Sequence, residues 1–334
     1  MAGLTTTLAA LNRYRRALGV AEETSHLAEV TSFGDNPAGL RMFAFVPEGL
    51  AADAGLLVAL HGCTETATEF DLACGWSVLA ARHGFAVLLP QQQARNNPAG
   101  CFNWFRAEEQ RRDGKEVASV MAMVDHMLAQ HRLDPRLVGV TGLSAGGALA
   151  ASLLALHPGR FAAGAILAGL PFAVAHDMGE GMALMAKGTA LPAEALVTAA
   201  RTASKHEGGW PRVAVWHGML DTVVAPGNAD ALARQFRGLH GLPDVPGDVH
   251  VTPMARVETW RDRAGHAVVT QTMVCGLGHA VPLSLADLDP DLRVGQIGPF
   301  AQEVGVAACW QIAEFLGLVR HATRPRGHWF WPFG

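Results

Sequence analysis

The chain has 334 residues, half of them hydrophobic and 17% charged, with a formal net charge of −4. This length suits one large α/β domain or two smaller ones, and the apolar fraction can fill a core on both faces of a sheet. The weak net charge excludes the basic field typical of proteins that bind nucleic acid or anionic membranes, and no apolar run reaches the length of a membrane span.

Leucines near helical spacing over residues 4–30 predict an N-terminal helical extension that occupies residues 1–30. Arg13, Arg15 and Arg16 come after the weakly apolar part of this segment, which is the reverse of a secretory signal. We therefore expect a cytoplasmic location, with secretion as the alternative.

The first strand signals follow. Residues 41–47 alternate like a half-buried edge strand and end at a proline. Residues 55–61 form a continuous apolar run, as a central parallel strand does. A helix is expected over residues 69–83, and residues 84–90 read as the next strand.

Residues 91–112 form a long polar loop that contains Cys101-Phe-Asn-Trp-Phe105. Asp113 and Glu116 have the spacing of a capping box, which predicts a helix over residues 114–132.

The rest of the chain continues the alternation of strands and helices. Residues 170–210 interrupt it as an insertion, expected to be helical and to lie where a lid would lie. We expect strands at 163–168, 212–217, 256–262 and 267–274, helices at 228–239 and 300–317, and a Pro/Gly-rich connection at 240–248. These elements predict one α/β domain over residues 31–320, with a doubly wound, mostly parallel sheet and helices on both faces.

Residues 321–334 form an aromatic C-terminal tail. Exposed aromatic rings would make a sticky patch, so we expect something to cover them. The tail could fold back on its own domain, meet a symmetry mate in a homodimer, or present an aromatic surface to an insoluble polyester.

The stretch Val138–Ala150 organises the chain. It begins as a short apolar run, turns at Gly142-Leu-Ser-Ala-Gly146 and continues into small, helix-compatible residues. Strand, G-x-S-x-G turn and helix are the arrangement of a nucleophile elbow, in which glycines flank a serine because the turn leaves no room for a Cβ. The pattern is short enough to arise by chance, so Ser144 needs partners before it can be assigned as a nucleophile.

A serine hydroxyl needs a base, and α/β hydrolases place an acid and then a histidine on loops that follow later strands. The strand at 212–217 leads to Asp221, and the strand at 267–274 leads to His279. We therefore expect Asp221 as the acid and His279 as the base of a catalytic triad.

Other residues compete for these roles. His61 and His217 also end strands, but each precedes a glycine and fits a hydrogen-bonded structural role better. Asp177 falls in the insertion, and Asp230 falls at a helix start, where capping explains it.

An oxyanion hole needs two backbone N–H donors. The amide of Ala145, directly after the serine, is the first. The second is expected from the loop after residues 55–61, and we assign the amide of Cys63.

None of the five cysteines lies in a C-x-x-C pair, so no metal site is expected. Cys63 and Cys101 follow neighbouring strands, at the strand ends where the site would form. We expect them to lie close together, close enough for a disulfide if their Cα atoms are within about 7 Å.

With these residues assigned, the sequence resembles the polyhydroxybutyrate depolymerase family of esterases, a branch of the α/β hydrolases. The resemblance covers residues 30–320 and rests on separate motifs in order. They are Leu60-His-Gly-Cys-Thr64, Gly84-Phe-Ala-Val87, Asn96-Asn-Pro98, Cys101-Phe-Asn-Trp-Phe105, Thr141-Gly-Leu-Ser-Ala-Gly-Gly147, Ala168-Gly-Leu-Pro171 and Gly278-His279.

The resemblance implies an α/β-hydrolase fold and ester hydrolysis through an acyl-enzyme, without a metal or organic cofactor. The implied substrate is a short-chain hydroxyalkanoate polyester or oligomer. The family also includes feruloyl and acetylxylan esterases, so these remain alternatives. Trp104, His61 and Asn103 are the candidate substrate contacts.

Two other classes stay open on the sequence. The chain could be an acyltransferase that uses the same triad, or a noncatalytic binding protein on the same fold. An intact triad in the expected order argues against the second.

Overall fold

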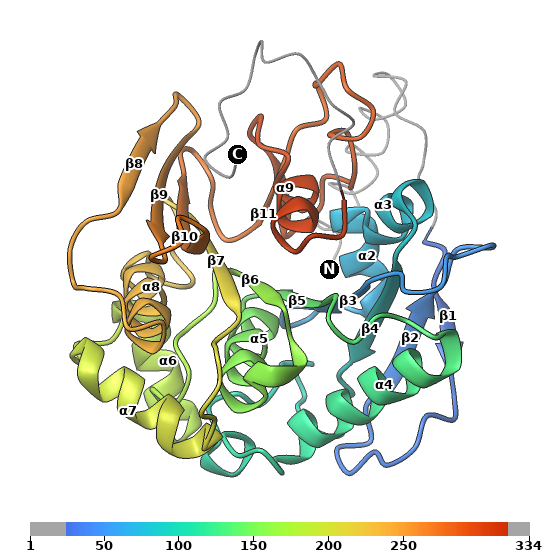
Figure 1. The fold of residues 1–334 in the computed structure, drawn as a ribbon, viewed down its shortest axis with the longest axis horizontal. Helices are drawn as coiled ribbons and strands as arrows, with labels where there is room; N and C mark the ends of the chain where they lie inside the picture. The colour runs from blue at the N-terminus through green and yellow to red at the C-terminus, as the bar shows by residue number, and fades with distance from the viewer. Residues whose placement is uncertain (1–24, 320–334) are drawn as a thin grey trace, which may run out of the picture.

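A single ten-stranded sheet runs through the computed structural model, which describes residues 25–319 (Figure 1). The strand order is β1-β2-β4-β3-β5-β6-β7-β10-β9-β8. From β4 to β10 along this order the neighbours pair in parallel, whereas the strands at each end pair antiparallel. The prediction of a mostly parallel sheet is therefore confirmed.

The strands follow the predicted segments closely, with short additions at the two edges. Their bounds are β1 (Ala28–Val30), β2 (Arg41–Phe45), β3 (Leu56–Leu60), β4 (Ala86–Gln91), β5 (Val138–Leu143), β6 (Ala163–Leu167), β7 (Arg212–Gly218), β8 (Asp248–Val251), β9 (Ala255–Arg261) and β10 (Ala267–Val274). A separate two-stranded sheet pairs β11 (Val281–Leu283) with β12 (Ala301–Glu303).

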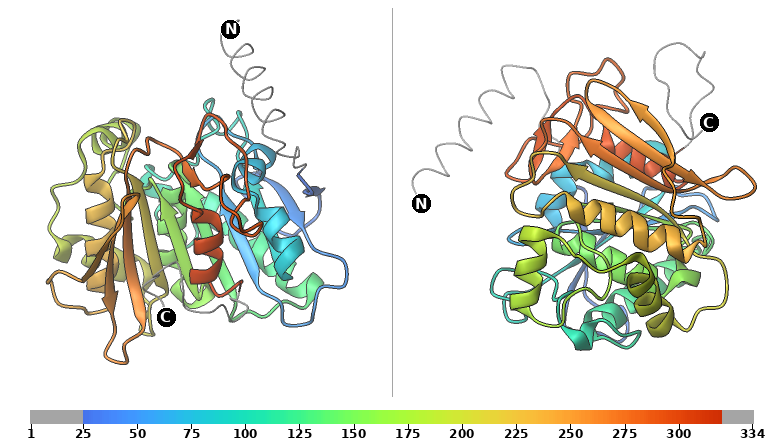
Figure 2. Two further views of the ribbon diagram at one scale, coloured as in Figure 1. Left: turned by 90° about the horizontal axis from the view of Figure 1, so that it is seen from above. Right: turned by 90° about the vertical axis from the view of Figure 1, so that its left-hand side faces the viewer.

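Helices cover both faces of the sheet, as predicted. Figure 1 shows α2, α3 and α9 on one side and α4, α5, α7 and α8 on the other. In the left view of Figure 2, α9 lies over the central strands. The helices are α2 (Ala67–Cys74), α3 (Trp76–His83), α4 (Lys115–His131), α5 (Ala145–Leu156), α6 (Met178–Lys187), α7 (Ala193–Ser204), α8 (Gly227–Leu239) and α9 (Ala308–Phe315), with short 3₁₀ turns at Ala107–Glu109 and Pro158–Arg160.

Strand β3 shows why the central strands read as continuous apolar runs. All five of its residues are buried. Leu56, Val58 and Leu60 join the core under α4, α5 and α8, while Leu57 and Ala59 join the core under α2, α3 and α9. Because a strand turns successive side chains to opposite faces, a sheet covered on both sides buries every position.

Gly75 breaks the helix that we expected over residues 69–83. It has a left-handed φ of 72° and separates α2 from α3. A Cβ placed there would lie 2.6 Å from the backbone nitrogen of Gly295, so the position needs glycine for contact as well as for conformation. The break therefore lets the loop before β12 approach α2.

One prediction near the N-terminus is wrong, and strand β1 overlaps the end of a second predicted segment. Strand β2 is not an edge strand, because β1 pairs with its outer side. β1 itself lies within residues 1–30, where a helical extension was expected. The rest of that extension, residues 1–24, lies outside the described residues, as does the aromatic tail at 321–334.

The capping box proposed for α4 is also wrong. Gly114 occupies the N-cap position and has no side chain to cap the helix, and the amide of Glu116 donates instead to Glu109 Oε2 at 2.8 Å. Asp113 pairs instead with Arg111 in an exposed ion pair, and Glu116 turns inward, where it is 2% exposed.

At the C-terminal end the predicted helix at 300–317 is shorter than expected. Its first residues form β12, which pairs with β11, and α9 begins only at Ala308. Strand β8 was not predicted either, because it begins inside the Pro/Gly-rich connection. Both missed strands are short, so their alternation gives little signal.

The insertion at 170–210 is helical, as predicted, and comprises α6 and α7. α6 is held beside the start of α8. Ala225 N donates to Met185 O at 2.7 Å, and Asn228 Nδ2 donates to Leu184 O at 3.0 Å. These bonds place α6 next to the loop that follows β7.

Candidate active site

Ser144 stands between β5 and α5 in a strained backbone conformation. Its φ is 57° and its ψ is −118°, which a residue with a Cβ rarely adopts. The Ser144 amide donates to Leu167 O of β6 at 2.9 Å, which ties the turn to the neighbouring strand. Strain of this kind persists only where the surroundings enforce it, and it gathers at functional sites.

The glycines that flank Ser144 are required by contact. A Cβ on Gly146 would lie 2.1 Å from Leu60 O, and a Cβ on Gly142 would lie 2.4 Å from Gly146 O. Both neighbours are backbone atoms that cannot move aside alone. The turn therefore packs against the end of β3, as the nucleophile-elbow interpretation requires.

Asp221 and His279 meet across the loops that follow β7 and β10. His279 Nδ1 donates to Asp221 Oδ2 at 2.7 Å, although the residues are 58 positions apart in the chain. Both side chains are nearly buried, with 8% of the His279 side chain and none of the Asp221 side chain exposed. Parallel pairing of β7 with β10 brings the two loops to the same edge of the sheet.

Asp221 is held as a carboxylate by several donors. Its Oδ1 accepts from the amides of Val223 and Val224 at 2.8 and 2.9 Å. Burial by itself would raise the pKa of Asp221, but hydrogen bonds from His217 and His279 outweigh it and lower the pKa below its usual range. The aspartate is thus ionised and fixed in orientation wherever the protein is folded near neutral pH.

Ser144 lies at the same edge of the sheet, because the loops after β5, β7 and β10 all leave the carboxyl ends of strands that pair in parallel through β6. Among the described residues, no hydrogen bond joins the Ser144 hydroxyl to the His279 ring. Catalytic hydrogen bonds of this kind often tighten only when substrate binds.

The loop after β3 lies beside Ser144. A Cβ added to Gly62 would lie 3.6 Å from Ser144 Cβ, so the His61–Cys63 turn runs close to the serine. Neither the Cys63 amide nor the Ala145 amide donates a hydrogen bond within residues 25–319. Both donors expected for an oxyanion hole are therefore available at this end of the sheet.

Cys63 and Cys101 form a disulfide with a Cα–Cα distance of 4.2 Å. The prediction that they lie close together is confirmed. The bond links the turn beside Ser144 to the loop that carries Trp104.

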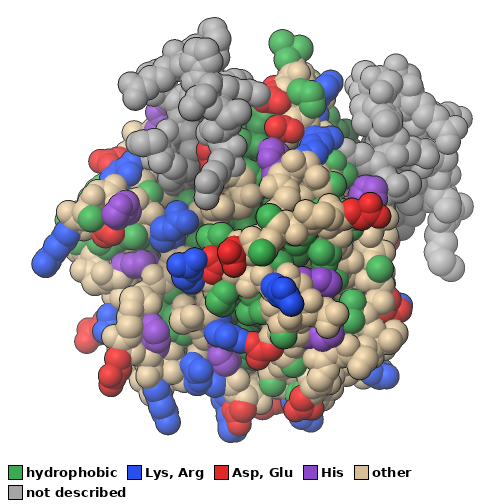
Figure 3. Space-filling view, turned by 45° about the vertical axis from the view of Figure 1, so that its right-hand side comes forward, with side chains coloured by type: hydrophobic (Ala, Val, Ile, Leu, Met, Phe, Trp, Pro, Cys, Tyr) green, Lys and Arg blue, Asp and Glu red, His purple; other side chains and the backbone are tan. Residues whose placement is uncertain are grey.

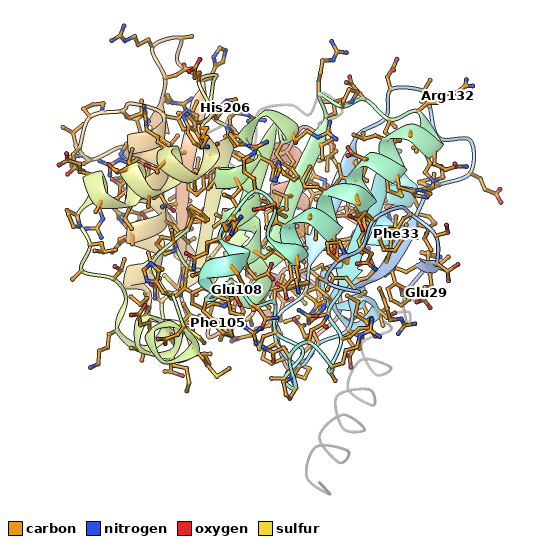
Figure 4. The ribbon with its side chains drawn as sticks, turned by 90° about the horizontal axis from the view of Figure 1, so that it is seen from below. Glu29, Phe33, Phe105, Glu108, Arg132 and His206 are labelled. Atoms are coloured by element: carbon orange, nitrogen blue, oxygen red, sulfur yellow. A yellow bond between two sulfur atoms is a disulfide. The ribbon has the colours of Figure 1, made fainter. Side chains whose placement is uncertain are left out.

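Trp104 is 7% exposed and packs edge-on against Phe105, with the ring centroids 5.7 Å apart. Both rings belong to a small apolar cluster with Ala145, beside the serine. A Cβ on Gly181 of α6 would lie 3.3 Å from Trp104 and 3.0 Å from Phe105. Figure 4 shows Phe105 near α6, at the opposite end of the molecule from His206 and Arg132.

His61 uses its ring to hold neighbouring backbone. It is fully buried, its Nδ1 donates to Gly62 O at 2.7 Å, and its Nε2 accepts from Gln92 N at 3.0 Å. Burial lowers the pKa of His61 to about 4, so the ring is neutral near pH 7. Both ring nitrogens are used to hold the backbone, and the substrate contact expected of His61 stays a prediction.

Asn103 has internal partners too. It is 4% exposed, and its Nδ2 donates to Glu116 Oε1 at 2.6 Å while its Oδ1 accepts from Asn97 Nδ2 at 3.2 Å. These bonds make Asn103 an anchor of the Trp104 loop, and its contact with substrate stays a prediction.

Sequence reasoning missed two carboxylates that hold these loops. Glu65 Oε2 accepts from Gly62 N at 2.7 Å, and Glu116 accepts from the backbone and side chain of Asn103 and from Gln92. Burial raises the pKa of each to about 7. The spacing of Glu116 in the sequence does not distinguish such an anchor from a helix cap. Glu65, by contrast, lies two residues after Cys63, and this closeness is the signal that could have identified it.

The competing acids have other roles. Asp177 caps α6 by accepting from Glu180 N at 2.9 Å. We expected Asp230 to cap α8, but it does not. Its side chain accepts from Gln271 Nε2 at 2.6 Å. Neither is bonded to His279.

Within the described part of the chain, no group of three or more His, Cys, Asp and Glu side chains could hold a metal ion. The same residues include no helix that is long and apolar enough to cross a membrane.

Comparison with known proteins decides the family. The family model described as esterase PHB depolymerase matches residues 40–259. The chain belongs to this family. The resemblance inferred from the sequence motifs is therefore confirmed, and the protein is a carboxylic ester hydrolase.

Individual relatives agree with this membership. Poly(3-hydroxyalkanoate) depolymerase C from Paucimonas lemoignei is 37% identical over 300 residues, covering 88% of this esterase and 70% of that protein. Acetylxylan esterase A from Aspergillus ficuum is 28% identical over 291 residues, covering 84% and 93%. The solved structure of an acetyl xylan esterase from Aspergillus awamori superposes with a TM-score of 0.70 at 25% identity, covering 76% of this chain and 94% of that one. The fold is the α/β-hydrolase fold.

Proposed function

We propose that Ser144, His279 and Asp221 are the catalytic triad of this esterase. The hydrogen bond from His279 Nδ1 to Asp221 Oδ2, at the sheet edge where the strained Ser144 stands, carries the assignment. It fixes the ring so that Nε2, the other nitrogen, can take a proton from the serine hydroxyl.

Hydrolysis then follows the acyl-enzyme route. His279 Nε2 takes the Ser144 proton as Oγ bonds to the ester carbonyl carbon, and the Cys63 and Ala145 amides donate to the oxyanion. The proton passes from His279 to the departing alcohol as the C–O bond breaks. Water, deprotonated by His279, attacks the acyl carbon, and as the bond to Ser144 Oγ breaks His279 returns this proton to Oγ, which releases the acid and restores the hydroxyl.

The Ser144→Ala variant tests this proposal. We expect kcat for p-nitrophenyl butyrate to fall at least about 1,000-fold, because the hydroxyl is the nucleophile. The melting temperature should stay within about 2 °C of wild type, since only one oxygen is lost. A fluorophosphonate probe should label the wild type and not the variant. Retention of a tenth of the wild-type turnover would refute the assignment.

We propose short-chain hydroxyalkanoate polyester or its oligomers as the substrate. The 37% identical relative carries the name of a poly(3-hydroxyalkanoate) depolymerase. Exposed apolar side chains also lie on the loop that carries Asp221 and on α6, which is hydrogen-bonded to the end of that loop. They are Met178 and Met182 on α6, at 55% and 66% exposed, and Met219, Leu220 and Val223 on the acid loop, at 48%, 63% and 46%.

Such an apolar rim suits a water-insoluble ester better than a hydrated polysaccharide. Trp104, packed beside Ala145, is the residue we propose to contact the acyl chain.

Acetylxylan or feruloyl ester hydrolysis is the second candidate, supported by the acetylxylan esterase relative at 28% identity. Release of 3-hydroxybutyrate from polymer film, compared with release of acetate from acetylated xylan at equal enzyme, decides between them. Product analysis with and without added alcohol tests the acyltransferase alternative.

The location of the protein also belongs to the proposal. The cytoplasmic location expected from the sequence stays a prediction. The Cys63–Cys101 disulfide supports the secreted alternative instead, because disulfides persist in oxidising compartments. Fractionation of the source cells tests the location of the protein. Size-exclusion chromatography tests the predicted homodimer.

A further inference from the structure

His217 is a second histidine at the acid loop, and the mechanism described above does not use it. It lies in β7, is 1% exposed, and stands four residues before Asp221. Its Nε2 is 2.8 Å from Val224 O and 3.3 Å from Asp221 Oδ2. One ring nitrogen thus faces both ends of the turn that presents the aspartate.

These partners fix the tautomer of His217. A backbone carbonyl can only accept, so Nε2 must carry a proton to bond Val224 O, and the same proton faces Asp221 Oδ2. The other nitrogen, Nδ1, is buried without a hydrogen-bond partner among the described residues. Buried polar atoms are nearly always paired, so the unpaired Nδ1 indicates that the position of the ring is set by the contacts of Nε2 with Val224 O and Asp221 Oδ2.

We propose that His217 is a positioning residue for the reaction, which holds Asp221 Oδ2 in the orientation that receives His279. The inference rests on the proposed triad. With His217 in place, the carboxylate is held on both oxygens: the Val223 and Val224 amides donate to Oδ1, His279 donates to Oδ2, and the Nε2–H of His217 faces Oδ2 at 3.3 Å. Rotation of the carboxylate would break bonds on both oxygens at once.

Without His217, Oδ2 keeps His279 as its donor and the turn loses the bond from β7 to Val224. The carboxylate could then swing within the buried site. Misorientation of the aspartate leaves substrate binding intact but impairs the proton transfers of His279, so the effect should fall on kcat and spare KM.

A pair of variants tests this with p-nitrophenyl butyrate. In His217→Phe the ring remains without a donor, and we expect kcat to fall about 10- to 100-fold with KM within about threefold of wild type. His217→Gln keeps an N–H donor at similar reach and should restore kcat to within about fivefold of wild type. If His217→Phe fails to fold, His217→Asn serves in its place, because its shorter amide cannot reach Asp221.

A double-mutant cycle with Asp221→Asn separates positioning from a merely structural role. If His217 acts through Asp221, the His217 substitution should lower kcat less than twofold in the Asp221→Asn background. Equal losses in both backgrounds would overturn the proposal. So would a variant that loses melting temperature but keeps wild-type kcat per fluorophosphonate-labelled molecule.

Failure of this inference is distinguishable from failure of the triad. If Ser144→Ala is inactive and His217→Phe is fully active, only the role of His217 is wrong. If Ser144→Ala remains active, the triad itself is wrong.

Discussion

Gly146 shows how strictly single positions are set around Ser144, the proposed nucleophile. A Cβ there would lie 2.1 Å from Leu60 O and 2.5 Å from His61 O, both backbone atoms of the neighbouring strand end. No side-chain rotation relieves such a clash. The second glycine of the G-x-S-x-G pattern is therefore required by contact between two chain segments that are distant in sequence.

We predict that Gly146→Ala destabilises the protein by about 3 kcal/mol or more, because the strand and the turn must separate to admit the methyl group. Urea denaturation measures the loss. Gly227→Ala is the matched control, since a Cβ at Gly227 meets nothing within 4 Å and the residue lies at the start of a helix. Equal stability of the two variants would contradict the prediction.

Glu65 holds the His61–Cys63 turn, and its contribution to the stability of the protein depends on pH. Burial raises its pKa from 4.5 to about 7, so the folded protein favours the neutral acid. Its contribution to stability is complete below about pH 4.5 and is lost as the pH rises through about 7. His61, whose pKa burial lowers, changes stability in the opposite sense over part of this range.

The difference between wild type and Glu65→Gln isolates the carboxyl. Between pH 5 and pH 8 we expect the wild type to lose about 1 kcal/mol of stability relative to the variant, after allowance for partial exposure of the group. Denaturation curves at both values measure this. A difference that does not change with pH would contradict it.

At the scale of elements, the site is assembled from loops that are joined to one another as well as to the sheet. The Cys63–Cys101 bond joins the loop after β3 to the loop after β4. Glu116 of α4 adds bonds to Asn103 and Gln92 on either side of Cys101. The Trp104 loop is thus anchored at both ends.

Replacement of Cys101 by serine should lower stability by about 3–4 kcal/mol, since the bond closes a loop across 38 positions. We also expect kcat to fall, because the Cys63 amide loses its tether. Thermal unfolding and soluble-ester kinetics measure both effects. The Cys309→Ser variant, at a buried free cysteine, is the control.

The central elements could be predicted from the sequence, because strands buried on both faces and the elbow leave strong local patterns. β3, β5 and β7 fell where the apolar runs placed them. The edge strand β1 and the break at Gly75 could not be predicted, since each depends on a partner distant in sequence.

The residues of the candidate site likewise fall into those that could be predicted from the sequence and those that could not. The order of Ser144, Asp221 and His279 along the chain was enough to nominate them, because each follows a predicted strand. The inward turn of Glu116 and the burial of His61 and Asn103 depend on packing between loops, which no local pattern reports.

At the scale of the whole molecule, charges of both signs are interspersed over the face shown in Figure 3, and no field of one sign gathers there. Contact with a solid substrate would therefore rest on apolar surface. The rim on α6 and the acid loop offers that surface next to the proposed triad.

We predict that Met182→Gln weakens adsorption to polyester film severalfold while hydrolysis of a soluble ester stays within about twofold of wild type. Val251→Gln on edge strand β8 is the matched control, since both side chains are 66% exposed. Depletion of protein from solution by film measures adsorption. Equal weakening by both variants would show that the rim has no special role.

Helix α5 begins directly after Ser144, the proposed nucleophile, and has no solvent-facing side: all twelve of its residues are buried. Such a helix cannot open by itself, because any local opening would expose core on several sides. Its amide protons should therefore exchange with solvent deuterium only through global unfolding, later than those of α6, whose residues are mostly exposed or half-buried. On heating, the esterase should then lose activity at the same rate at which its core unfolds.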